Sequence, residues 1–325
     1  MERPLGGPIL TRGTKLVLAV AGAAAVLVGV RVLAGLGVVS AMNDGYPWGL
    51  WKPLNVVTFT GVGAGALALA LVTYVANRGR FHPLVRSAVL VGAIAYTLAG
   101  TSVVVDLGRW WWMWAIFFPP WWNLDSILLE VALCVVAYCA VLWLEVLPAL
   151  LEVWRRGEGR LARLAVRDLP WHRRAFPFLL ALAVVLPLMH QSSLGSLFLV
   201  TPTKLHPLWH TGWLPALFLL SCLAMGAGAV IAVDTLTALV WGRRRDRSLD
   251  ATLGLVMAGF ALAFAALRVG DVAFAGELAE VHGPKGLLFL VELALFLYPA
   301  ARVLQPSYRR NPGYLLWAAL LTLAG

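Results

Sequence analysis

Apolar runs of about 20 residues recur along almost the whole chain, and they constrain its fold more than any other feature. Eight of them can be read, at 16–39, 54–76, 86–105, 126–151, 175–200, 213–241, 251–274 and 285–303. A helix of about 20 apolar residues crosses the hydrocarbon core of a bilayer. Inside lipid each run must be helical, because its backbone polar groups need partners within the same segment. The sequence therefore predicts an all-α integral membrane protein, a polytopic bundle of eight complete transmembrane helices in a single domain over residues 1–325.

A ninth apolar run begins at Tyr314 and reaches the last residue, Gly325. These residues would rise about 18 Å as a helix, which is less than the roughly 30 Å of the hydrocarbon core. We therefore expect an incomplete, truncated ninth span. Only 13% of the residues are charged and 61% are hydrophobic, whereas soluble domains carry about 25% charged residues. A water-soluble globule is excluded.

The basic residues lie in short clusters between the apolar runs. The net charge of +10 therefore forms no single basic face, and no nucleic-acid partner is expected. The amino terminus and the loops at 77–86, 152–174, 242–250 and 302–311 hold 20 of the Lys and Arg residues, and the alternate loops and span ends hold six. By the positive-inside rule, this asymmetry predicts that the amino terminus is cytoplasmic.

Tryptophan, proline and glycine gather in the loops on the opposite side. The segment 109–123 alone holds six tryptophans, among them Trp112. An interfacial aromatic belt is the ordinary explanation of such rings. Their concentration on one face would also suit docking of a partner or entry of a flat apolar ligand.

Several ionisable side chains fall inside the apolar runs, where their cost makes a functional role the default hypothesis. Glu130 and Glu145 share a helical stripe with Cys134 and Tyr138, and the two carboxylates would lie roughly 22 Å apart along the axis. That stripe could carry protons across the membrane. Arg268 with Asp271, and Asp106 with Arg109, could instead be ion pairs that tie helix ends together. The other polar residues within runs are Tyr96, Asp234 and Glu292.

The stretch 186–195 reads Leu-Pro-Leu-Met-His-Gln-Ser-Ser-Leu-Gly. Its proline is expected to break the fifth span, and His190 and Gln191 would then lie near the outer surface. A histidine there can hydrogen-bond a quinone carbonyl and pass it a proton. It could equally cap a broken helix.

Haem and metal ligands are not evident in the sequence. A transmembrane haem b with two histidine ligands needs both at compatible depth, and of the six histidines only His190 lies at the edge of a span. The three cysteines form no CxxC pair and no close grouping with histidine. We therefore expect no haem, no iron–sulfur cluster and no metal site on this chain.

Five sequence blocks carry a resemblance to a known family. They are Gly-Tyr-Pro-Trp-Gly-Leu-Trp at 45–51, Asn-Arg-Gly-Arg-Phe-His-Pro-Leu-Val-Arg at 77–86, Asp-Leu-Gly-Arg at 106–109, Met-His-Gln-Ser-Ser-Leu-Gly-Ser at 189–196 and Lys-Leu-His-Pro-Leu-Trp at 204–209. From about residue 4 to residue 325 the chain resembles the NrfD or polysulfide-reductase-C family, and within it the HybB-type membrane subunits of type-2 nickel–iron hydrogenases. The resemblance implies two four-helix bundles plus accessory helices, without haem.

The same resemblance implies a function. The chain would be the quinone-reactive anchor of a hydrogenase:quinone oxidoreductase in the bacterial cytoplasmic membrane, with menaquinone or another quinone bound near the periplasmic face and lipid around it. A periplasmic ferredoxin-like iron–sulfur subunit would relay electrons from the small and large nickel–iron hydrogenase subunits. Relatives have residues linked to quinone or proton transfer at the positions of Tyr96, Glu130, His190 and Asp234, although at the last position they have a glutamate.

These considerations lead to a set of candidate site residues. We expect proton transfer through Glu130, Tyr96, Asp234 and Glu145, and quinone binding by His190, Asp106, Arg109, Gln191 and Trp112. Three alternatives remain open. The chain could anchor a molybdenum enzyme of the polysulfide or sulfoxide reductase kind, it could be a proton or solute transporter, or it could be a passive tether.

Overall fold

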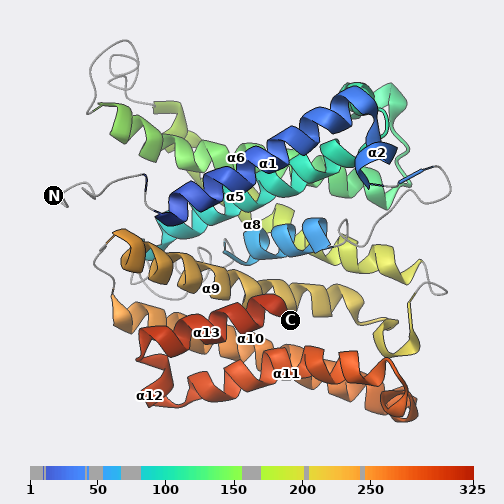
Figure 1. The fold of residues 1–325 in the computed structure, drawn as a ribbon, viewed down its shortest axis with the longest axis vertical. Helices are drawn as coiled ribbons and strands as arrows, with labels where there is room; N and C mark the ends of the chain where they lie inside the picture. The colour runs from blue at the N-terminus through green and yellow to red at the C-terminus, as the bar shows by residue number, and fades with distance from the viewer. Residues whose placement is uncertain are drawn as a thin grey trace.

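The computed structural model describes residues 10, 12–40, 42–43, 54–66, 82–155, 170–200, 205–241 and 246–325. Nearly all of these residues are helical (Figure 1). Within them, seven helices are long and apolar enough to cross a membrane, and two shorter apolar helices lie at Leu54–Ala66 and Pro312–Ala324. The prediction of a polytopic all-α membrane protein is confirmed.

The helices follow the apolar runs of the sequence. They are α1 (Arg12–Ala34), α2 (Leu36–Ser40), α5 (His82–Asp106), α6 (Ile127–Arg155), α8 (Pro170–Leu199), α9 (Leu214–Trp241), α10 (Arg247–Phe274), α11 (Gly286–Leu304), α12 (Pro306–Arg309) and α13 (Pro312–Ala324). A π-helical turn at Leu54–Thr58 opens the helix that continues to residue 66. Short 3₁₀ helices occupy Trp110–Phe117, Pro119–Trp121, Pro207–Trp209 and Glu277–His282.

The spanning helices form two groups. The first bundle contains α5, α6 and α8 with the helix at 54–66, and the second contains α9, α10, α11 and α13. The two groups fill the upper and lower halves of Figure 1 and meet where α8 and α5 contact α9. The short apolar helix α13 has 13 residues, and its carboxyl end lies partway along α9 (Figure 1). α13 packs against α9, α10 and α11 and therefore belongs to the second bundle.

α1 lies on the outside of the first bundle, with only 6% of its apolar window buried. Its Arg31 side chain is buried and donates hydrogen bonds to the carbonyl oxygens of Val105 and Leu107 at the end of α5. The last carbonyls of a helix have no partner within the helix and form the negative end of its dipole. Arg31 therefore fastens an otherwise lipid-facing helix to the end of α5.

Glycine allows the closest approach between the two bundles. A Cβ atom on Gly226 of α9 would lie 2.0 Å from the carbonyl carbon of Gly65, and one on Gly65 would lie 1.8 Å from the carbonyl oxygen of Cys222. Membrane helices have no hydrophobic drive to associate in lipid, so they rely on close packing at small residues. The two backbones therefore meet directly at this crossing.

The fifth span differs from the expectation. α8 continues without interruption from Pro170 to Leu199, through Pro187, which is itself buried. A proline removes one backbone donor, but neighbouring helices make this tolerable in a membrane helix. The predicted break at this proline is wrong, and His190 lies inside a continuous helix.

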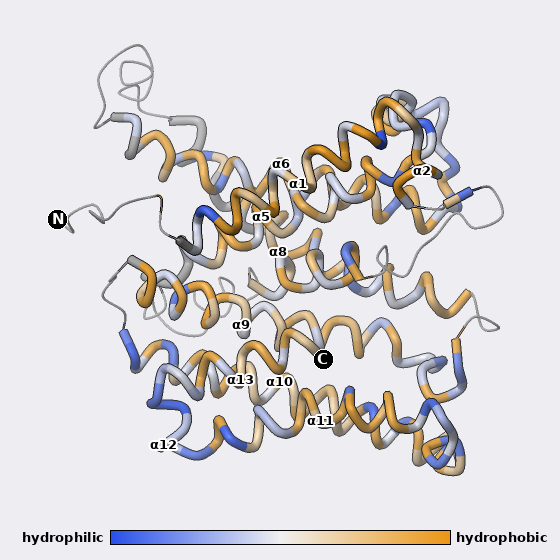
Figure 2. The backbone as a smooth tube through the Cα atoms, in the orientation of Figure 1, coloured by the Kyte–Doolittle hydropathy of each residue, from blue (hydrophilic) through white to orange (hydrophobic). Residues whose placement is uncertain are grey.

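Successive spanning helices are antiparallel, so the loops gather at two ends of the molecule. We call the described residues 107–126, 205–213 and 275–285 the tryptophan-rich end, and 246–247 with 305–311 the arginine-rich end. Figure 2 shows hydrophobic residues along the helices and hydrophilic ones concentrated at the ends, notably at α12. Large apolar side chains such as Leu287 and Leu288 are exposed on the helix surfaces. That pattern is the one expected where lipid covers the bundle.

Candidate functional site

Three aromatic rings from three helices of the first bundle meet in its interior. The ring centroids of Tyr96 on α5 and Tyr138 on α6 are 4.4 Å apart in an edge-to-face arrangement. Those of Tyr96 and His190 on α8 are 5.8 Å apart. Gly63 abuts the first of these rings, because a Cβ atom at this glycine would lie 2.4 Å from Cδ2 of Tyr96. The site therefore lies between four helices of one bundle.

The polar atoms of this cluster are buried without hydrogen-bond partners. They include the hydroxyls of Tyr96 and Tyr138, both ring nitrogens of His190 and the side-chain nitrogen of Gln191. Gln191 approaches the hydroxyl of Tyr96, and His190 approaches the backbone of Val131. Buried polar groups in proteins are nearly always paired, so an unpaired group needs an explanation. Several together indicate a site built to meet a polar ligand or to pass protons.

A second polar pair lies beside this cluster, closer to the tryptophan-rich end. The hydroxyl of Ser193 on α8 donates a hydrogen bond of 2.7 Å to Oε1 of Glu130 in the first turn of α6. Glu130 is exposed on the surface of the bundle. Ser193 follows His190 by one helical turn, so the two side chains share one face of α8. We call this pair, Glu130 and Ser193, the rim of the buried cluster, because Glu130 is accessible from the surface.

The stripe predicted on the fourth span faces the interior over most of its length. Cys134, Tyr138 and Val141 are buried on α6, and Oε1 of Glu145 is buried without a hydrogen-bond partner. Glu145 lies seven residues beyond Tyr138, which is about 10 Å along the helix. The stripe therefore connects the aromatic cluster with the arginine-rich half of the bundle.

Asp234 is buried on α9, in the half nearer the arginine-rich end. Its backbone carbonyl accepts a hydrogen bond from the hydroxyl of Thr237, which is 3.0 Å away. Asp234 thus lies on α9, the helix of the second bundle that contacts α5 and α8. The other predicted proton-transfer residues lie on α5 and α6.

The predicted quinone-binding residues are not all brought together. Asp106 is the last residue of α5, ten residues and about 15 Å beyond Tyr96. Arg109 is exposed and precedes the 3₁₀ helix Trp110–Phe117. Trp112 is also exposed and stacks on Trp114, with ring centroids 5.2 Å apart. His190 and Gln191 belong to the buried cluster, whereas the other three candidates lie at the tryptophan-rich end.

A polar network in the second bundle was only partly anticipated. Arg268 of α10 is 2% exposed, and its Nε lies 3.7 Å from Oε1 of Glu292 on α11. The indole nitrogen of Trp209 donates a 2.6 Å hydrogen bond to Oε2 of the same carboxylate. Asp271 accepts a 2.8 Å hydrogen bond from the hydroxyl of Thr211. The sequence offered Arg268 and Asp271 as a candidate pair within one helix. In the structure, each instead contacts a residue of another segment, Glu292 and Thr211 respectively.

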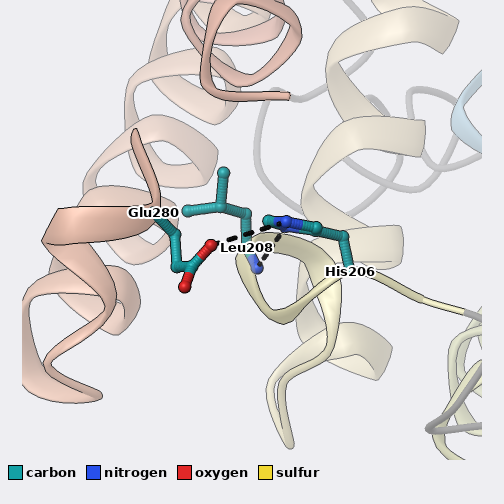
Figure 3. A network of polar contacts seen from close by, with 3 residues as sticks. All are labelled: His206, Leu208 and Glu280. Carbon is teal, nitrogen blue, oxygen red and sulfur yellow. Dashed lines mark hydrogen bonds and ion pairs between the residues drawn. The ribbon is translucent and has the colours of Figure 1, made fainter. Parts of the chain in front are cut away.

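His206 extends this network at the tryptophan-rich end (Figure 3). Its Nδ1 accepts a hydrogen bond from the backbone N–H of Leu208 at 3.4 Å, and its Nε2 lies 3.6 Å from Oε2 of Glu280. The backbone donor places the ring proton on Nε2, which faces the carboxylate. Residues 205–209, the described part of the block at 204–209, therefore attach the connection between α8 and α9 to the second bundle. In the sequence, the family resemblance singled out this block.

The fold, the lipid-facing surface and the polar interior define a multi-pass integral membrane protein. The chain belongs to the NrfD family, because the family model described as "Polysulphide reductase, NrfD" matches residues 38–325. The "Probable Ni/Fe-hydrogenase 2 b-type cytochrome subunit" of Escherichia coli (strain K12) is 34% identical over 336 residues, which cover 99% of this chain and 81% of the relative. The "Menaquinone reductase, integral membrane subunit" of Nitratidesulfovibrio vulgaris is 26% identical over 316 residues, 91% of this chain and 74% of the relative. The protein is thus an NrfD-type membrane subunit related to subunits of two redox enzymes.

One of these names contradicts the expectation that the chain carries no haem. The relative from Escherichia coli is called a b-type cytochrome subunit, and that name points to haem. The expectation rested on counting histidine pairs within the spans, whereas haem iron also accepts other axial ligands. Among the described residues, no group of three or more His, Cys, Asp or Glu residues could hold a metal ion. Haem needs only one or two axial ligands, so this finding does not restore the expectation, which the name of the relative overturns.

Proposed function

We propose that this chain is the quinone-reactive membrane anchor of a respiratory hydrogenase complex. In this proposal it passes electrons between an iron–sulfur partner and menaquinone, and nickel–iron hydrogenase subunits supply those electrons from hydrogen. The relationship to a hydrogenase 2 subunit and to a menaquinone reductase subunit supports this assignment. The observation that carries it is the buried His190, with both ring nitrogens unpaired, behind the exposed pair of Glu130 and Ser193.

The proposed quinone head group binds at this rim. Reduction of a quinone adds two electrons and two protons, and each carbonyl oxygen becomes a hydroxyl. His190 is a suitable hydrogen-bond partner for one carbonyl oxygen, because an imidazole N–H can donate to that oxygen and the second ring nitrogen can take up a replacement proton. Glu130 can supply the proton to the other oxygen. The electrons come from the iron–sulfur partner, which docks at the tryptophan-rich end in this proposal.

The proposed proton route runs from the arginine-rich half of the bundle toward the rim. Tyr96 and Tyr138 touch each other next to His190, and Glu145 follows on the same stripe of α6. Asp234 on α9 is the candidate entry point. The step of about 10 Å between Tyr138 and Glu145 requires a chain of at least two bridging waters.

The proposed orientation has the arginine-rich end in the cytoplasm, since cytoplasmic loops carry the excess of Lys and Arg. The rim then lies nearer the periplasmic side of the cytoplasmic membrane. Protons taken from the cytoplasm for quinone reduction, together with protons released outside by hydrogen oxidation, build a proton gradient. In the reverse direction, the same quinone site and proton route consume the gradient and drive hydrogen formation.

A substitution at His190 tests the quinone site. In membranes that contain the assembled complex, His190→Gln is expected to lower hydrogen-dependent quinone reduction about 100-fold, the usual scale for loss of a positioned acid or base. Met189→Leu is the matched control, because this neighbour on α8 is exposed on the helix surface. Reduction at the wild-type rate by an assembled His190→Gln complex would refute the quinone site and favour a passive tether.

The description of the matching family favours a second candidate, the anchor of a polysulfide-reducing molybdenum enzyme. Electrons would then leave quinol at the same rim. Extraction in a mild detergent separates the two, because a hydrogenase large subunit copurifies in one case and a molybdenum subunit in the other. Recovery of the chain without any redox partner, together with quinone-independent proton transport in liposomes, would instead indicate a transporter.

A further inference from the structure

A cavity opens at the arginine-rich end, between the first turns of α10 and the turn formed by α12. Its volume is about 580 Å³, and its lining includes Arg247, Arg309 and Arg310. Three arginines from two separate elements thus line one space. The cavity lies in the second bundle and shares no residue with the proposed quinone site.

The charge of this cavity is not compensated from within. No carboxylate pairs with Arg247 or Arg310 anywhere in the part of the chain that the structure describes, and no acidic residue lines the cavity. Asp246 accepts hydrogen bonds from two backbone N–H groups of the first turn, so it caps α10. The nearby Asp250 is buried and lies off the cavity wall. An anion is the ligand that this arrangement of guanidinium groups fits.

Neighbouring contacts hold two of the arginines in place. The side chain of Arg309 donates a 2.7 Å hydrogen bond to the carbonyl oxygen of Leu304. Tyr308, one residue earlier, accepts a hydrogen bond from Arg302, whose guanidinium lies 4.0 Å from the centre of the Tyr308 ring. The turn that presents Arg309 and Arg310 is therefore fixed against the end of α11.

The wall along α10 combines polar and apolar side chains. Ser248 and Thr252 are its polar residues and Ala251 and Leu255 its apolar ones, and Leu255 lies about 12 Å along the helix from Arg247. Leu255 is also partly exposed on the outer surface of α10. A phospholipid would match both parts of this lining, with its phosphate beside the arginines at the membrane interface and an acyl chain beside Leu255 toward the hydrocarbon core. A free phosphate ion would use the arginines alone.

We propose that this cavity binds the phosphate group of an anionic phospholipid, with an acyl chain along the Leu255 side of α10. The lipid connects α10 with the turn before α13, and so holds the short α13 in the second bundle. Basic pockets between transmembrane helices are suited to anionic head groups, and each basic residue at an anionic surface adds severalfold to the affinity.

The test uses the full chain in a nonionic detergent, titrated with phosphatidylglycerol, phosphatidylcholine or inorganic phosphate, with bound lipid counted by native mass spectrometry. The wild-type protein should retain one phosphatidylglycerol molecule in preference to phosphatidylcholine. Arg247→Gln and Arg310→Gln should each weaken this binding about fivefold. Lys285→Gln removes one exposed positive charge at the tryptophan-rich end and should leave the binding unchanged.

Three results would overturn the proposal. Equal retention of the two lipids would show that charge does not select the occupant. A loss with Lys285→Gln as large as with Arg310→Gln would show that surface charge alone is responsible. Competition by millimolar inorganic phosphate without lipid preference would assign the cavity to a free anion. Arg310→Lys retains the charge and should retain most of the binding, which distinguishes a lost contact from a misfolded variant.

Discussion

Replacing Glu292 by leucine should destabilise the second bundle strongly, because it removes the ion-pair partner of the buried Arg268. Arg268 is 2% exposed and Glu292 is 19% exposed, with 3.7 Å between their interacting atoms. At an effective dielectric constant of about 20, two unit charges at that separation attract by about 4–5 kcal/mol. Removal of one member of a buried pair typically costs about 3–5 kcal/mol, since the other charge stays desolvated.

The double variant Arg268→Met with Glu292→Leu separates this cause from simple loss of packing. Replacement of both charges by apolar side chains of similar size is often nearly neutral. We therefore expect the double variant to recover to within about 1–2 kcal/mol of the wild-type protein. The residual loss comes from Trp209, whose indole N–H no longer has its 2.6 Å acceptor.

The assay is equilibrium unfolding of the purified chain in mixed micelles of a nonionic detergent and sodium dodecyl sulfate. A loss of 3 kcal/mol shifts the folding equilibrium by roughly 100-fold. Glu280→Gln is the control, since this carboxylate is 50% exposed beside His206 and an exposed pair contributes only about 0–1 kcal/mol. A Glu292→Leu variant as stable as Glu280→Gln, or a double variant less stable than Glu292→Leu, would refute the argument from burial.

Three further predictions concern the helix crossing, α1 and the rim. Gly226→Ala should lower the free energy of unfolding by about 1–3 kcal/mol in the same assay, because the new methyl group would overlap the backbone of Gly65. Gly259→Ala is the control and should be neutral or slightly stabilising, since a Cβ atom there would meet no atom within 4 Å. Arg31→Gln should release α1 from the end of α5 and speed its cleavage in limited proteolysis, and unchanged cleavage would show that these hydrogen bonds do not hold it. Glu130→Gln should slow proton uptake coupled to quinone reduction on the order of 100-fold in proteoliposomes, and unchanged uptake would rule out this carboxylate as part of the route.

The features that depend on local chemistry were predictable from the sequence. The spans follow from apolar runs, because a backbone in lipid must satisfy its own hydrogen bonds. The stripe from Glu130 to Glu145 follows from the helical repeat, and the structure buries its middle residues Cys134 and Tyr138 but leaves Glu130 exposed. The break at Pro187 was wrongly predicted, because a proline's effect depends on the helices that surround it.

Contacts between helices were decided by the tertiary structure. Tyr96, Tyr138 and His190 come from three separate spans, and nothing in their local sequence states that their rings meet. One interpretation of the sequence paired Arg268 with Asp271 three residues away, but the packing of α10 against α11 brings Glu292 to Arg268.

The sequence by itself thus determined a bundle of membrane-spanning helices and the face that each polar stripe presents, since hydrophobicity and helical periodicity are properties of each segment. Only the tertiary structure decided which faces meet. That choice depends on the close approach of small residues such as Gly65 and Gly226, and on the pairing of buried charges between helices far apart in the chain.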